Sequence, residues 1–138
     1  MWGQNKKPKQ TAHIDSLIGQ NTEIHGDVIF SGGLHVDGTV KGSVIAEKGD
    51  DSVLTLSERG TIEGEVKVPN VVVNGSVIGD VHATGHVELA THARVHGNVY
   101  YSLIEMAMGA EVNGKLMHQA DNNETAVEVK IEEKTEDA

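Results

Sequence analysis

The chain has 138 residues, enough for one domain with a real core and too few for two. It has no cysteine, which excludes disulfides and thiolate metal sites, and only 3% of its residues are aromatic, which is few for a core built on large rings. A net charge of -10 argues against a nucleic-acid-binding protein, because such proteins present a basic face to phosphates.

The first 13 residues lack any hydrophobic periodicity, and we predict a flexible, basic N-terminal arm over 1–13. Residues 1–12 contain three lysines and no acidic residue. A tryptophan is favoured at a membrane interface, and each lysine near an anionic leaflet contributes about 1 kcal/mol. We therefore predict weak membrane binding that a polymer with many arms would strengthen, although an arm that only keeps the chain soluble is an alternative. The predicted membrane-binding residues are Met1, Trp2, Lys6, Lys7 and Lys9.

The body of the chain repeats one short motif, apolar-x-Gly-x-apolar. Successive copies are 16, 22, 15, 18 and 17 residues apart, and the longest step contains a polar insertion at 47–52. A nearly fixed period of this size is typical of a solenoid, in which each repeat buries its apolar face against its neighbours. The six copies begin at Ile24, Val40, Ile62, Val77, Val95 and Val112.

The residues between these motifs alternate between apolar and polar over short runs, which predicts strands of a few residues and few or no helices. Within each motif we expect the two apolar residues and the glycine between them to point inward, the glycine allowing a tight bend or a close backbone approach. A mean repeat of about 17.6 residues fits three strands per turn. We therefore predict an all-β parallel β-helix of about six coils over 14–118. An antiparallel sandwich with glycine-rich hairpins is the alternative.

Neither end of this solenoid has an evident polar cap. The arm and the acidic tail at 119–138, which we predict to be disordered, are too hydrophilic to cover an apolar coil. Bare terminal coils would also leave unpaired strand edges, so we predict end-to-end stacking into filaments, unless a tail folds back over one end. The predicted polymerisation interface consists of Ile14, Leu17, Ile18, Ile24, Phe30, Leu103, Met106, Met108, Leu116 and Met117.

The repeated V-x-G-x-V units, the LHVDGTVKGSV stretch at 34–44 and the VVVNGSVIGDV stretch at 71–81 resemble those of the bactofilins, bacterial polymer-forming cytoskeletal proteins. The resemblance extends to the layout of basic arm, repeat domain and tail. It implies a right-handed helix and nucleotide-independent filaments assembled through the terminal coils. It also implies a cell-shape or envelope role, as a scaffold for cell-wall enzymes. The start of the chain is similar to family members that attach to the membrane, so we expect a cytoplasmic protein peripheral to the inner membrane.

Residues suited to catalysis or cofactor binding are not grouped in any recognisable motif. Eight histidines are present, but most fall at alternating outward positions, so we expect no catalytic, cofactor or metal site and no enzyme activity. The absence of a GxxxxGK[ST] loop disfavours a nucleotide-driven filament. The alternatives are a left-handed hexapeptide-type acyltransferase, whose six-residue period this sequence keeps only briefly, and a glycan-binding β-helix, which would need more aromatic side chains.

Overall fold

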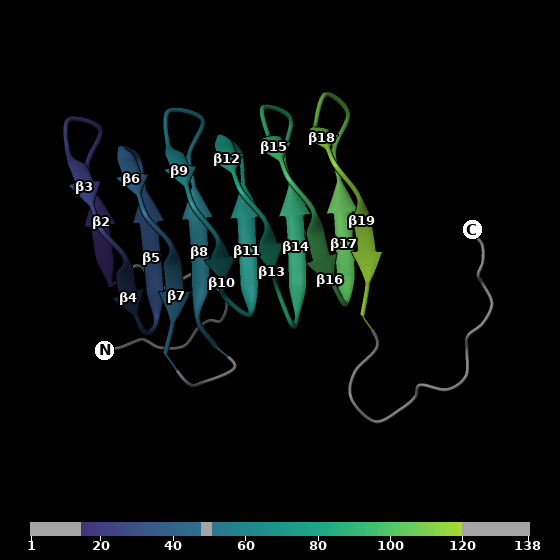
Figure 1. Ribbon diagram of the computed structural model, residues 1–138, viewed down its shortest axis with the longest axis horizontal. Coiled ribbons are helices and arrows are strands. Elements are labelled where there is room, and N and C mark those ends of the chain that lie inside the picture. Colours follow the sequence, from purple (N-terminus) through teal and green to yellow (C-terminus); the bar gives the residue numbers. More distant parts are fainter. Residues whose placement is uncertain (1–14, 48–50, 120–138) are drawn as a thin grey trace, which may run out of the picture.

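A computed structural model describes residues 15–47 and 51–119, and within these ranges the chain forms strands and no helix. The strands make three sheets of six parallel strands each (Figure 1). The first sheet contains β2 (Ser16–Ile18), β5 (Gly33–Val36), β8 (Val53–Leu56), β11 (Asn70–Val73), β14 (His86–Leu89) and β17 (Leu103–Met106). The second contains β3 (Glu23–His25), β6 (Thr39–Lys41), β9 (Thr61–Glu63), β12 (Ser76–Ile78), β15 (Arg94–His96) and β18 (Glu111–Asn113). The third contains β4 (Val28–Phe30), β7 (Val44–Ala46), β10 (Val66–Lys67), β13 (Val81–His82), β16 (Val99–Tyr101) and β19 (Leu116–His118).

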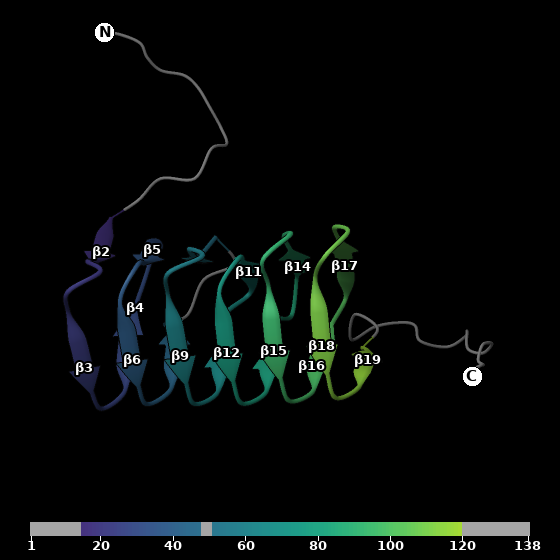
Figure 2. The same ribbon diagram turned by 90° about the horizontal axis from the view of Figure 1, so that it is seen from above.

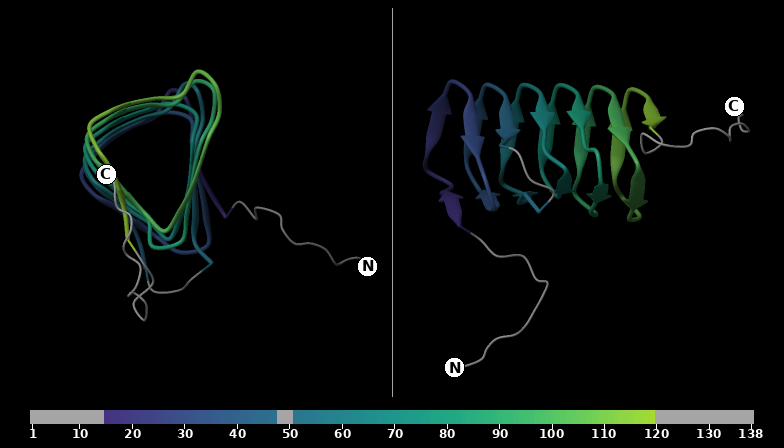
Figure 3. Two further views of the ribbon diagram at one scale, coloured as in Figure 1. Left: turned by 90° about the vertical axis from the view of Figure 1, so that its right-hand side faces the viewer. Right: turned by 90° about the horizontal axis from the view of Figure 1, so that it is seen from below.

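Each turn of the chain adds one strand to each sheet, and the three sheets form the sides of a triangular, right-handed solenoid (Figure 3). Seen from above, successive coils lie side by side along one axis (Figure 2). The predicted parallel β-helix of about six three-stranded coils is confirmed. The antiparallel sandwich is wrong, because the sheets pair in parallel throughout the part of the chain that the structure describes. The predicted arm and tail lie outside the described residues, apart from Gln119.

The core consists of columns of apolar side chains, one residue from each coil. In the second sheet, for example, Val40, Ile62, Val77 and Val95 occupy one register position and are fully buried. Branched aliphatic side chains suit such stacking because they are stiff and fit a pleated surface. The core therefore needs almost no aromatic residues, which agrees with the composition.

The motif glycines form a column of their own, at the corner between the second and third sheets. A Cβ added to Gly64 would lie 2.5 Å from the carbonyl carbon of Gly42, one coil earlier, and the glycines at 42, 79, 97 and 114 are blocked in the same way. The expected close backbone approach is therefore present, but the expected inward orientation is wrong. These glycines are partly or fully exposed at the corner, and their missing side chains would collide with the neighbouring coil's backbone rather than enter the core.

Turn lengths explain the uneven repeat. The insertion that connects β7 to β8 and the long turn at 57–60 both fall within the step of 22 residues. The shorter steps of 16 and 15 residues contain the short turns at 37–38 and 74–75. The coils thus keep their strand register while the corners absorb the differences in length.

We expect Gly64→Ala to destabilise the fold by about 1–3 kcal/mol, because the added methyl must displace a backbone carbonyl. Gly19→Ala is the matched control, since its Cβ would meet nothing closer than the Thr22 hydroxyl at 3.9 Å. Chemical unfolding followed by circular dichroism measures both. Equal stability of the two variants would contradict the packing role assigned to the glycine column.

Candidate polymerisation faces

Among residues 15–47 and 51–119, the first and last coils give each of the three sheets an edge strand that is paired on one side only. Strands β2, β3 and β4 form one end of the solenoid, and β17, β18 and β19 form the other (Figure 1). Unpaired edge strands present backbone N–H and C=O groups that can pair with another chain. Both ends are therefore candidate assembly faces, which we call the N-terminal face and the C-terminal face.

The C-terminal face exposes residues that continue the core columns. Met106 lies in register with the buried Leu89 but is 46% exposed, and Leu116 lies in register with the buried Val99 but is 42% exposed. Ile104 and Val112 occupy two further core columns and are only partly buried. Within the described part of the chain, this face is thus a cross-section of the apolar core with no coil after it.

The N-terminal face is less apolar. Ile24 and Val28 occupy core columns and are partly buried, whereas Ile18 and Phe30 are already buried within the first coil. Ser16 is in register with Leu34, so a polar residue replaces an aliphatic one in that column. The two faces therefore differ in the apolar surface that they offer.

Charged groups flank the N-terminal face on the second sheet. The Lys41 ammonium lies 3.1 Å from the Glu23 carboxylate, and His25 Nε2 lies 3.0 Å from the same oxygen. The hydrogen bond from Lys41 and its charge lower the pKa of the Glu23 carboxyl, and Glu23 in turn raises the pKa of Lys41. Any stabilisation from Glu23 is therefore present above the pKa of the unfolded chain and is lost as the pH falls through the lower folded value.

The predicted interface residues divide into three groups. Met106, Leu116 and Ile24 lie in core columns at the two faces, which is the arrangement we expected. Leu17, Leu103 and Met117 instead lie in the outward rows that contain His35, His86 and Tyr100, so they are exposed on the sides of the solenoid. The remainder are Met108, exposed in the turn at 107–110; Ile18 and Phe30, buried in the first coil; and Ile14, outside the described residues.

Three side chains that sequence reasoning did not group meet on the third sheet. Glu65, Asp80 and His82 can each contribute one ligand atom, and these atoms all lie within 4.8 Å of one another. The Asp-x-His spacing on a strand places two of them on one face, which the sequence alone could have suggested. Their approach to Glu65 depends on the register between coils. From the sequence we expect no metal site, so this cluster is a feature that only the structure brings together.

The predicted membrane-binding residues Met1, Trp2, Lys6, Lys7 and Lys9 lie outside the described residues. Over 15–47 and 51–119, no helix has the length and apolar character needed to cross a membrane.

Comparison with known proteins identifies the family. The sequence model described as "Bactofilin: Polymer-forming cytoskeletal" matches residues 16–117, nearly the whole solenoid. The chain is 30% identical to Bactofilin BacO of Myxococcus xanthus over 108 residues, which are 78% of this chain and 82% of that protein. It is 31% identical to Bactofilin BacP of the same organism over 98 residues, or 70% of this chain, and covers only 41% of BacP. No solved structure matches the chain significantly. The chain therefore belongs to the bactofilins, a family of polymer-forming cytoskeletal proteins.

Proposed function

We propose that this bactofilin assembles end to end, through its two terminal faces, into nucleotide-independent filaments. The filaments lie on the cytoplasmic face of the inner membrane and organise cell-shape or cell-wall machinery, with cell-wall enzymes or other envelope proteins as partners. End-to-end assembly is supported by the C-terminal face, where core columns end in half-exposed side chains and, among the described strands, three sheet edges have no further partner.

Burial at this face provides a driving force for assembly. Full burial of one large aliphatic or methionine side chain contributes about 1.5–3 kcal/mol, and Met106 and Leu116 each retain close to half of their exposure. Hydrogen bonds between the edge strands of two subunits would also fix their relative orientation, because the terminal strands of one subunit must align with those of the next. A contact of this kind needs no bound nucleotide, which fits a polymer-forming family.

Attachment to the membrane rests on the sequence of the arm. Trp2 supplies an amphipathic ring, and Lys6, Lys7 and Lys9 supply positive charge in a segment without acidic residues. One arm binds an anionic surface weakly, and a filament with one arm per subunit binds it firmly through multivalency. The acidic body makes nucleic acid an unsuitable partner for the same filament.

The acyltransferase and glycan-binding alternatives gain no support. The family to which the chain belongs is described as polymer-forming and cytoskeletal. Bactofilins are structural proteins rather than enzymes, so the proposal assigns this chain a mechanical and organisational role.

We expect Leu116→Arg to abolish filaments, because a guanidinium buried in a desolvated subunit contact costs several kcal/mol. Ile78→Arg is the matched control, since Ile78 is 49% exposed, against 42% for Leu116, but points outward from a middle coil. Negative-stain electron microscopy and sedimentation compare both variants with the wild type, and circular dichroism verifies that each is folded. Filaments of folded Leu116→Arg, or their loss in both variants alike, would contradict assembly through the C-terminal face.

We expect Trp2→Glu to release filaments from anionic vesicles while leaving polymerisation intact, because the aromatic anchor is lost and a charge enters the interface. Gln4→Glu is the control, since it makes the same change in charge within the arm but keeps the tryptophan. Co-sedimentation with vesicles of phosphatidylglycerol and phosphatidylethanolamine measures binding, and electron microscopy measures polymer. Retention of Trp2→Glu filaments on the vesicles would remove the basis for membrane attachment through this residue.

A further inference from the structure

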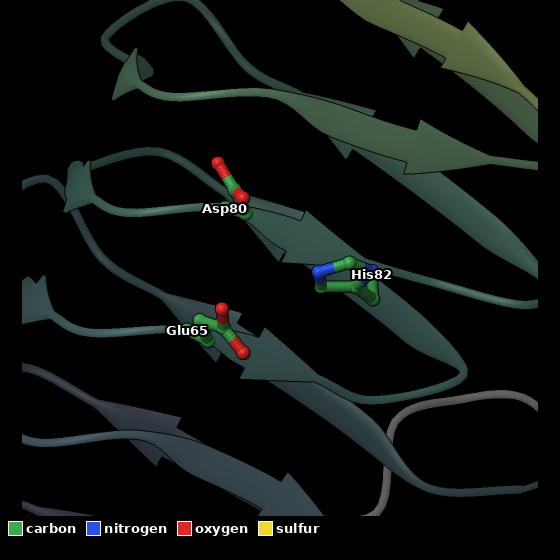
Figure 4. A group of neighbouring side chains, drawn as sticks. All are labelled: Glu65, Asp80 and His82. Carbon is green, nitrogen blue, oxygen red and sulfur yellow. The ribbon is translucent and has the colours of Figure 1, made fainter.

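We propose that Glu65, Asp80 and His82 form a binding site for a divalent transition-metal ion, of which Zn²⁺ is the best fit. One ligand atom from each side chain lies within 4.8 Å of the other two, and all three side chains project from the same face of neighbouring strands (Figure 4). This proposal is independent of the filament model, because the site lies on the side of a middle coil, away from both terminal faces.

The strand register creates the cluster. Val66 pairs with Val81 and Lys67 pairs with His82, so Glu65 and Asp80 lie opposite each other where β10 and β13 begin. His82 follows Asp80 by two residues, which returns its side chain to the same outward face. The three ligands therefore come from two consecutive coils held at a fixed spacing by the sheet.

Two carboxylates directly opposite each other across paired strands repel one another. The Lys67 ammonium, 3.5 Å from Glu65 Oε1, offsets part of this charge, but one lysine faces two carboxylates. A divalent cation between Glu65 and Asp80 would offset the repulsion that remains. The cluster thus has an electrostatic reason to bind a cation.

Two of the ligands are already oriented by neighbouring groups. The His82 ring stacks on Tyr100, with ring centroids 4.5 Å apart and planes within 4° of parallel. Asp80 Oδ1 accepts a hydrogen bond of 2.9 Å from the Asn98 backbone N–H, which holds the carboxylate and leaves its second oxygen for a metal. Such supporting contacts fix the direction of metal ligands and reduce the entropy lost on binding.

The surroundings leave room for water ligands. An open hollow of about 640 Å³ lies beside the cluster and is lined by Glu65 and His82 together with Glu47, Lys67 and Thr84, among others. One imidazole, two carboxylates and a water form a four-coordinate set that suits Zn²⁺. Ca²⁺ and Mg²⁺ prefer oxygen ligands alone, so the histidine argues for a transition metal.

The combination occurs at one place among the described coils. Along the column of residues that directly follow the motif glycines, two consecutive coils both carry a carboxylate only at Glu65 and Asp80. The column that contains Glu65 and Asp80 reads Asp27, Ser43, Glu65, Asp80, Asn98 and Lys115, by extension of the strand register. The column that contains His82 reads Ile29, Ile45, Lys67, His82, Tyr100 and Met117.

The test uses the full chain without a histidine tag and titrates it with Zn²⁺ by calorimetry. We expect one Zn²⁺ per chain, an affinity at least about tenfold weaker in both His82→Gln and Asp80→Asn, and unchanged affinity in His96→Gln. His96 is the matched control because it also points outward from a strand, but its register neighbours are Ile78 and Asn113 rather than acids. Co²⁺ in place of Zn²⁺ gives a visible absorption band that reports ligation directly.

A second readout is thermal stability. A metal that bridges two coils of the folded chain raises the unfolding temperature, so we expect Zn²⁺ to stabilise the wild type and His96→Gln but not His82→Gln. The proposal is overturned if the wild type binds no Zn²⁺ at 100 μM or below, if His82→Gln binds as tightly as His96→Gln, or if His96→Gln loses the site. Circular dichroism without metal verifies that every variant is folded.

Discussion

The close stacking of backbone at the glycine corner is the constraint on which the rest of the structure depends. At this corner each coil packs directly onto the carbonyl of the motif glycine one coil earlier, and a Cβ at Gly42 or Gly64 would prevent that approach. Hydrogen-bonded strands fix the spacing of the coils at about 4.8 Å, so no coil can move away to accommodate a side chain there. The glycine therefore recurs once per turn, and the flanking apolar residues recur with it as core columns.

The repeat made the solenoid predictable, because the motif occurs once in each coil, at the corner between the second and third sheets. It could not predict the direction of every apolar side chain near the ends. Because Leu17, Leu103 and Met117 are apolar, their residue type alone suggests that they lie in the core or at its ends. In the structure they lie in outward rows instead. Their true direction follows from strand register, which a sequence specifies strongly only where one face is already known to be buried.

The Glu65–Asp80–His82 cluster was not predicted, although the repeat contains its register. Glu65 and Asp80 each come directly after the glycine of their motif, so alignment of the two motifs places them opposite each other whatever the length of the turns between them. His82 shares the outward face with Asp80 by alternation along one strand. The sequence does not reveal how closely the three side chains approach, because that distance depends on side-chain rotamers and on the packing of neighbouring coils.

The same regularity that stabilises the middle coils leaves apolar core columns partly exposed at the C-terminal end of the described solenoid. Six coils at about 4.8 Å each give a subunit on the order of 30 Å long, so an end-to-end filament would present one basic arm about every 30 Å. If the arm binds an anionic leaflet as proposed, three lysines would contribute about 3 kcal/mol to that attraction, which would leave a single subunit largely free. Linked subunits would add these contributions while losing translational freedom only once, so in the proposed model polymerisation would determine whether the protein stays on the membrane.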